Sequence, residues 1–300
     1  MRLVSGAPLI AALLLTGCTL SPLARQTAAF SSATSFVVDN SEDAFRSAVR
    51  RNDRVQSALL VARYDTQPMD PHAIKHLIDA EGLRTRRTVL DGLRSYAQTV
   101  ADLAGGVSSK QLDDASAAVG SNLVSLGSAV SATTPVGIAI TPEQANGAST
   151  AMKALGEFLI SRKINGSLPK TIEAMDPSVD ALCKLLLDDI AVLRRQSGND
   201  YEVLLMEQDA FIRHAGKDLQ PIERRAEIER LPQILAEKQA ADDMLADLER
   251  CVRQLALTHH ALAAAAGKKD APSLTARIAE LSATGQRLAS YYQSLPTATS

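Results

Sequence analysis

Histidine, cysteine, serine and carboxylate side chains are the groups in this sequence that could do chemistry, and their spacing decides which chemistry. His72 and His76 are four residues apart, a spacing that places two side chains on one face of a helix, where they could bind one metal ion. Ala73 stands where the HExxH motif of zinc proteases has its glutamate, so no general base is supplied. We therefore predict that these histidines lie in a solvated first helical turn, and that the chain binds no metal.

Two further patterns invite a catalytic interpretation. Ser167 and Lys170 have the SxxK spacing of penicillin-binding proteins and β-lactamases, but the companion SDN and KTG elements are missing. Asp188-Asp189 and Asp242-Asp243 are adjacent carboxylates, and neighbouring helical side chains point about 100° apart. We expect both aspartate pairs on solvated faces and predict no catalytic residue.

His259 and His260 have no partner that the sequence identifies. His259 falls on the apolar seam of a predicted long helix. This position is typical of a hydrogen-bonded histidine in a core or an interface, so we do not predict a ligand role. The P-loop, GxSxG and GxGxxG motifs are also missing. The sequence therefore predicts a protein without a cofactor and without enzymatic activity.

The first 18 residues carry the most specific motif. Arg2 precedes the uninterrupted apolar run Ala7–Leu15, which has the form of a secretory signal and is shorter than the roughly 20 residues of a membrane-spanning helix. The run ends in Leu15-Thr16-Gly17-Cys18, which resembles the lipobox of bacterial lipoproteins at all four positions.

That resemblance implies removal of residues 1–17 and a thioether-linked diacylglyceryl group on Cys18. In most Gram-negative bacteria it also implies a third, amide-linked acyl chain. Each buried methylene contributes about 0.8 kcal/mol, so two or three acyl chains would hold the protein to a membrane. Thr19 follows the lipidated cysteine instead of aspartate, which by the same resemblance favours the outer membrane, facing the periplasm.

Cys183 and Cys251 remain as an even pair, in a compartment that permits disulfides. A bond between them would close a long loop and stabilise the fold by about 4 kcal/mol in the chain-entropy model. The alternative is that both are ordinary buried core residues. We keep the disulfide as a hypothesis.

Composition limits the remaining functions. Lys plus Arg number 32 and Asp plus Glu 34, with both signs interspersed, so the chain has no basic surface for nucleic acid. Aromatic residues make up only 3%, and tryptophan is missing. A core of small and unbranched side chains favours helices and disfavours the aromatic-lined pockets typical of small-molecule sites.

Hydrophobic spacing predicts an all-α fold, an elongated bundle of about six to eight helices, some long and antiparallel. Residues 18–39 have the Ser/Thr/Ala-rich composition of a flexible tether, residues 40–296 form the predicted bundle, and residues 297–300 a disordered tail. Predicted helix starts are Asn40-Ser41, Asp70-Pro71, Ser109, Thr141-Pro142, Asp176-Pro177, Ile222 and Ser273. A break at Gly198-Asn199 stays open, and Val136–Ile140 is the one candidate strand.

Ala115–Pro142 carries no charge and is rich in Ala, Ser and Gly. It is either a central helix with closely packed neighbours or a hairpin that inserts into a membrane. The sequence thus leaves three functions. The first is a lipid-anchored, non-enzymatic module that binds an unknown envelope protein. The second is a membrane-active protein that uses residues 115–142, and the third is an enzyme with an unrecognised site.

Overall fold

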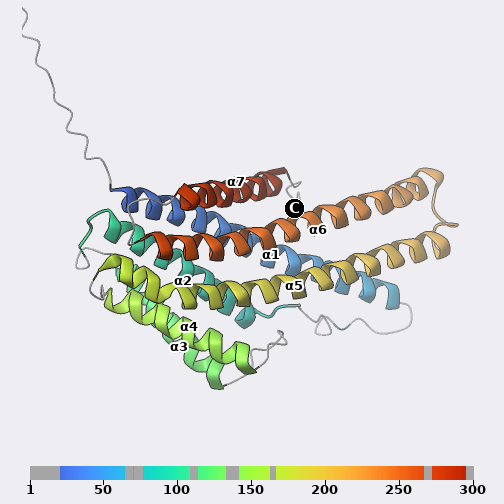
Figure 1. The fold of residues 1–300 in the computed structure, drawn as a ribbon. Helices are drawn as coiled ribbons and strands as arrows, with labels where there is room; N and C mark the ends of the chain where they lie inside the picture. Colours follow the sequence, from blue (N-terminus) through green and yellow to red (C-terminus); the bar gives the residue numbers. More distant parts are fainter. Residues whose placement is uncertain are drawn as a thin grey trace, which may run out of the picture.

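The computed structural model describes residues 21–64, 70, 77–108, 114–132, 142–162, 167–266 and 272–294. Within these residues the chain forms seven α-helices and no strand (Figure 1), which confirms the predicted all-α class. The helices are α1 (Pro22–Arg63), α2 (Ala80–Ala104), α3 (Asp114–Ala132), α4 (Pro142–Ser161), α5 (Leu168–His214), α6 (Pro221–Ala265) and α7 (Pro272–Ser294).

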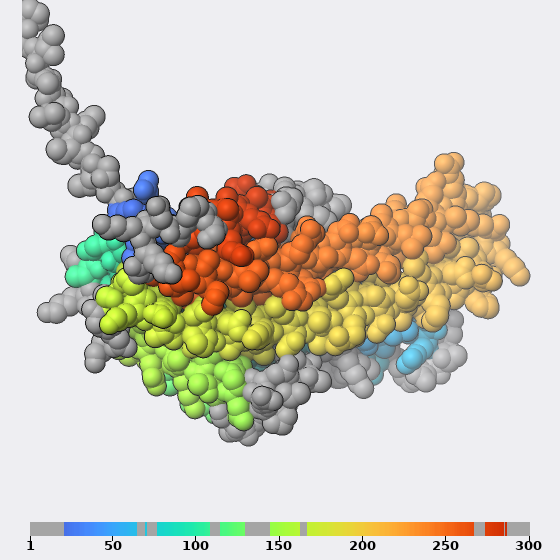
Figure 2. Space-filling view, viewed as in Figure 1, coloured from blue at the N-terminus to red at the C-terminus, as the bar shows by residue number. Residues whose placement is uncertain are grey.

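The body is elongated because three of its helices are very long. α5 has 47 residues and α6 has 45, which at 1.5 Å per residue makes each about 70 Å long. They form an antiparallel hairpin that runs the length of the molecule, with the start of α1 at one end and the α5–α6 turn at the other (Figure 1). The shorter helices pack around the end where α1 starts, and the hairpin extends past them (Figure 2).

Two apolar cores hold the bundle together. The larger joins all seven helices and includes Phe30, Leu90, Leu155, Leu182 and Leu245. The smaller lies toward the α5–α6 turn and consists of Val55, Tyr201, Leu204, Ile234 and Ala241, from α1, α5 and α6 only. In the described part of the chain, three helices and this small core therefore hold the far end together.

The prediction of a flexible tether over residues 18–39 is wrong for Pro22 onward. α1 begins at Pro22, and the Ser21 Oγ accepts a hydrogen bond from the Ala24 N–H at 3.1 Å. The Thr27 and Thr34 hydroxyls donate to main-chain carbonyls one turn back, at 2.9 and 2.8 Å. Because these bonds satisfy the hydroxyls within the helix, a Ser/Thr-rich stretch can be buried. Cys18 lies outside the described residues.

Other helix boundaries differ from prediction in an instructive way. α2 begins at Ala80, where the Asp79 carboxylate accepts a hydrogen bond from the Gly82 N–H at 2.6 Å, and not at Asp70-Pro71. His72 and His76 fall outside the described residues. α5 begins before the predicted start and contains Pro177. It also continues through Gly198-Asn199. Packing along the whole hairpin outweighs the one main-chain hydrogen bond that Pro177 cannot donate.

α3 and α4 approach each other through glycine. A methyl group on Gly156 would lie 2.5 Å from the Gly120 carbonyl oxygen, and the Ser149 hydroxyl donates to the Gly127 carbonyl at 2.6 Å. This contact matches the interpretation of the uncharged segment as a helix with close neighbours. No helix in the described ranges is long and apolar enough to cross a membrane. Residues 133–141, which include the candidate strand, lie outside those ranges.

Candidate functional site

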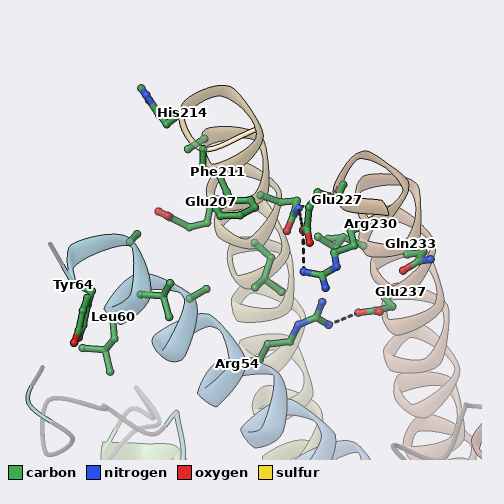
Figure 3. Close-up of a pocket in the computed structure, with 18 residues that line it drawn as sticks. Arg54, Leu60, Tyr64, Glu207, Phe211, His214, Glu227, Arg230, Gln233 and Glu237 are labelled. Carbon is green, nitrogen blue, oxygen red and sulfur yellow. Dashed lines mark hydrogen bonds and ion pairs between the residues drawn. The ribbon is translucent and has the colours of Figure 1, made fainter. Parts of the chain in front are cut away.

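A groove of about 950 Å³ opens at the far end of the bundle, between α1, α5 and α6. We call this end the tip and define it as residues 54–64, 204–215 and 221–237. The groove exists because α1 diverges from the α5–α6 hairpin there (Figure 3). Its lining includes Ala58, Val61 and Tyr64 of α1, Leu204, Phe211 and His214 of α5, and Glu227, Ile234 and Glu237 of α6.

Exposed apolar side chains gather at the tip. Eleven large apolar side chains are exposed in the described part of the chain, and seven belong to the tip: Val61, Tyr64, Met206, Phe211, Ile222, Ile228 and Leu235. Tyr64 is 65% exposed and Val61 71%. A concentration of apolar surface at one place marks an interaction site more often than scattered residues do.

Two ion pairs lie around the groove. The Arg54 guanidinium meets the Glu237 carboxylate at 2.7 Å, which joins α1 to α6, and Arg230 meets Glu227 at 2.9 Å (Figure 3). The Gln208 amide donates to the Glu227 main-chain oxygen at 3.1 Å and to its carboxylate at 3.0 Å, which joins α5 to α6. A groove with an apolar floor and paired charges at its rim suits an amphipathic ligand.

A buried polar cluster borders the small core. Arg51 and Asn52 of α1 and Ser197 and Asp200 of α5 are all buried, and the Arg51 guanidinium lies over the Tyr201 ring. The Arg51 Nε is 3.6 Å from the Asp200 carboxylate. Burial raises the pKa of Asp200 above its ordinary value, against the hydrogen bond from Gln196 and the charge of Arg51.

The clearest hydrogen-bonded chain lies in the main core. The Tyr96 hydroxyl is 2.8 Å from the His259 Nε2, the His259 Nδ1 is 2.8 Å from Asp176, and the His260 Nδ1 is 2.7 Å from the other Asp176 oxygen. His259 is fully buried, as expected for a hydrogen-bonded core histidine, whereas the His260 side chain is 74% exposed.

The hydrogen bonds from Tyr96 to His260 join side chains of three helices, α2, α5 and α6. The hydrogen bond from His259 holds the pKa of Asp176 below its ordinary value, and burial raises the pKa of Tyr96. None of these residues lines either pocket described, so the buried groups face no substrate-sized space there. The described residues also include no group of three or more His, Cys, Asp or Glu side chains that could hold a metal ion.

Sequence reasoning missed one buried ion pair. Arg86 Nε and Nη2 donate to the Asp189 carboxylate at 2.7 and 2.8 Å, across α2 and α5, and both side chains are buried. The prediction that both Asp188-Asp189 carboxylates are solvated is therefore wrong for Asp189. Adjacency to a second aspartate hid the signal, which was its place one residue before the buried Ile190.

The other predicted candidates have structural roles. Ser167 caps α5, and its hydroxyl accepts from the Lys170 N–H at 3.5 Å, so this SxxK match is a helix start. Asp242 pairs with Lys238 at 3.1 Å, and Asp243 accepts from Gln239 at 3.0 Å.

The two body cysteines lie in the main core. Cys183 on α5 and Cys251 on α6 are fully buried. The structure records no bond between their sulfur atoms, and the disulfide stays a hypothesis. Burial raises the pKa of Cys183 to about 12, which keeps that thiol protonated and unreactive at neutral pH.

Comparison of the chain with protein-family models, with curated proteins and with solved structures finds no match.

Proposed function

We propose that this chain is a lipid-anchored cell-envelope lipoprotein with a non-enzymatic helical body that binds a partner protein at the tip. One observation carries the proposal. Exposed apolar side chains gather around a groove at the end of the body opposite the start of α1, and α1 starts four residues after the lipobox cysteine. Attachment and binding thus fall at opposite ends.

The start of α1 and the tip lie far apart along the body. Ala58 is 36 positions after Pro22 in α1, which corresponds to about 54 Å along the helix axis. Because only three residues separate Cys18 from Pro22, the body itself spans that distance and a flexible tether does not. The Cys18 lipid would fix the near end, and the long helices would present the tip away from it.

The occupant that fits the groove is an amphipathic helix of the partner. The stretch of α5 from Leu204 to His214 lines the groove and is about 15 Å long, which matches nearly three helical turns. Among the described residues, α1, α5 and α6 surround the small core at the tip, so an added helix would complete a four-helix arrangement. An apolar stripe at i, i+3/i+4 and i+7 would face Val61, Tyr64 and Phe211, and its flanking charges would meet the rim.

Two other functions have less support. A membrane-active role for residues 115–142 would have to separate α3 from α4, whose backbones touch through Gly120 and Gly156. An enzyme would need reacting groups in a pocket, and the hydrogen-bonded chain from Tyr96 to His260 lies outside both pockets. Liposome leakage would reveal the first function, and substrate turnover the second.

Site-specific photo-cross-linking in cells tests the partner site. A photoreactive residue at Phe211 should yield a discrete cross-linked product, and the cross-linked peptide should come from an amphipathic helix of another envelope protein. The same residue at Leu257, an exposed apolar position of α6 away from the tip, is the matched control. Equal products from both positions, or none from Phe211, would refute tip binding.

The anchor needs a separate experiment. Cys18→Ser should abolish metabolic labelling with palmitate and leave unprocessed precursor. Label that persists on this variant would refute the lipoprotein part of the proposal and leave the tip proposal standing.

A further inference from the structure

A second hollow lies between α1 and α2, and its lining is rich in arginine. It has a volume of about 140 Å³ and is lined by Arg46 of α1 and by Arg84, Arg86 and Arg87 of α2. The apolar part of the lining comes from Phe45, Leu83 and Leu90, and Glu42 is the one acidic residue in it. Four arginines and one glutamate thus line this hollow.

Three of the four arginines have carboxylate partners. The Arg86 side chain is nine-tenths buried and bonded to Asp189, so it forms a fixed wall of the hollow. The Glu42 carboxylate accepts from Arg46 at 2.8 Å and from Arg87 at 3.3 Å. Arg46 also lies 3.5 Å from Asp43. One carboxylate therefore serves two arginines from different helices.

Arg84 is the fourth arginine in the lining of the hollow. Within the described part of the chain, no carboxylate pairs with its guanidinium, and it lines the same hollow as Arg46 and Arg87. Guanidinium groups present their N–H donors in a planar fork that matches phosphate or carboxylate oxygens. Three such forks around a small hollow form a site for an anion with several oxygens.

We propose that this arginine hollow binds a phosphate group. Its volume of about 140 Å³ leaves room for a small oxyanion such as phosphate. The phosphate oxygens would receive N–H donors from Arg84, Arg87 and Arg46, and Glu42 would yield part of its share of the last two. This site is independent of the tip and of the proposed partner.

The phosphate could belong to a free ion or to a lipid headgroup, and two soluble probes distinguish these sources. Inorganic phosphate and dihexanoyl phosphatidic acid are titrated separately into the full-length chain in detergent, with binding measured by calorimetry. Dihexanoyl phosphatidylcholine is the reference, because the choline cation of its headgroup balances the phosphate charge. Saturable binding of inorganic phosphate supports a site for the free ion. Binding of phosphatidic acid alone supports a headgroup site.

Variants make the assignment specific. Arg84→Ala and Arg87→Ala should each weaken binding about tenfold or more, because each removes charge-assisted hydrogen bonds. Glu42→Gln should tighten binding, since it removes the competing carboxylate, and loss of folding cannot imitate a gain. Arg225→Ala is the matched control, because it removes one arginine at the tip, 79% exposed and paired with Glu229.

The outcomes decide the proposal. Binding that weakens in both hollow variants, tightens in Glu42→Gln and stays within about twofold in Arg225→Ala supports it. Lack of saturable binding of either phosphate probe overturns it. Equal loss in Arg225→Ala, or weaker binding in Glu42→Gln, also overturns it, because the interaction would then depend on overall charge and not on this hollow.

Discussion

Removal of one partner of the buried Arg86–Asp189 pair should destabilise the protein far more than replacement of both. In Asp189→Leu the Arg86 guanidinium would stay buried with one remaining hydrogen bond, from its Nη1 to the Gly82 carbonyl at 3.1 Å, and its contact over the Phe45 ring. A buried charge left without its counter-ion costs about 3–5 kcal/mol. We expect Asp189→Leu to lower the free energy of unfolding by about 3 kcal/mol or more.

The double variant Arg86→Met/Asp189→Leu should recover most of this loss. Burial raises the pKa of Asp189 above its ordinary value, although the charge of Arg86 and its hydrogen bonds act in the opposite direction. The ion pair therefore does not fully offset the cost of removing the carboxylate from water. For such pairs, well-packed apolar replacements are often neutral or stabilising.

The sign of the pH dependence follows from the same shift. Because the folded-state pKa of Asp189 is raised, its contribution to stability is fully present below the unfolded pKa of about 3.9. That contribution is lost as the pH rises through the folded value. The double variant lacks this carboxyl group. The difference in free energy of unfolding between it and the native chain should therefore change with pH between the unfolded and the folded pKa of Asp189.

Urea unfolding followed by circular dichroism measures these differences. Asp209→Ala is the control, because the Asp209–Arg213 pair is exposed on α5, with 49% and 74% of the two side chains accessible. Exposed pairs contribute about 0–1 kcal/mol. A loss in Asp189→Leu below about 1 kcal/mol, or a double variant no more stable than the single one, would refute the reasoning.

Three further predictions concern the rest of the bundle. Gly156→Ala should destabilise the protein by about 1–3 kcal/mol, because its methyl group would lie 2.5 Å from a carbonyl of α3, whereas Gly147→Ala, with open space around it, should not. Thermal unfolding compares the two, and equal stability would count against the close α3–α4 contact. The hydrogen bond from His259 lowers the pKa of Asp176. This carboxylate should therefore stabilise the fold above the unfolded pKa of about 3.9, and the stabilisation should be lost as the pH falls through the folded value. Asp176→Asn should abolish this acid dependence, and a variant whose urea unfolding depends on pH as the native chain does would contradict the prediction. Cys183 and Cys251 should resist a thiol reagent in the native protein and yield two thiols on denaturation without reductant. A count of no thiols in a monomer would instead support the disulfide.

Helix content and the approximate helix ends followed from the sequence because local physics sets them. Apolar spacing of three and four residues, glycine at helix ends and proline at helix starts predicted α4, α6 and α7 close to their observed bounds. α6 continues through Pro232 for the same reason: its apolar phase is unbroken on both sides. His259 was placed correctly in the core because it shares that phase.

Composition misled where burial depended on a distant partner. Residues 22–39 have the Ser/Thr/Ala content of a linker, yet Phe30 and Val37 are buried against other helices and the hydroxyls are satisfied within α1. Asp189 has the local sequence of a surface aspartate, yet it meets Arg86, which lies 103 positions earlier in the chain. Nothing within one helical turn of either residue indicates the other.

By itself, the sequence determined the helical class, the N-terminal motif that ends at Cys18 and the small-residue character of the core, because each depends on residues close together in the chain. Tertiary structure alone decided which faces stay uncovered. The groove at Val61, Tyr64 and Phe211 exists because α1 diverges from the α5–α6 hairpin (Figure 3). The arginine hollow exists because Arg46 meets Arg84 and Arg87 across a helix pair. Such sites depend on where long helices end and how they are aligned, and that alignment results from packing along the whole bundle.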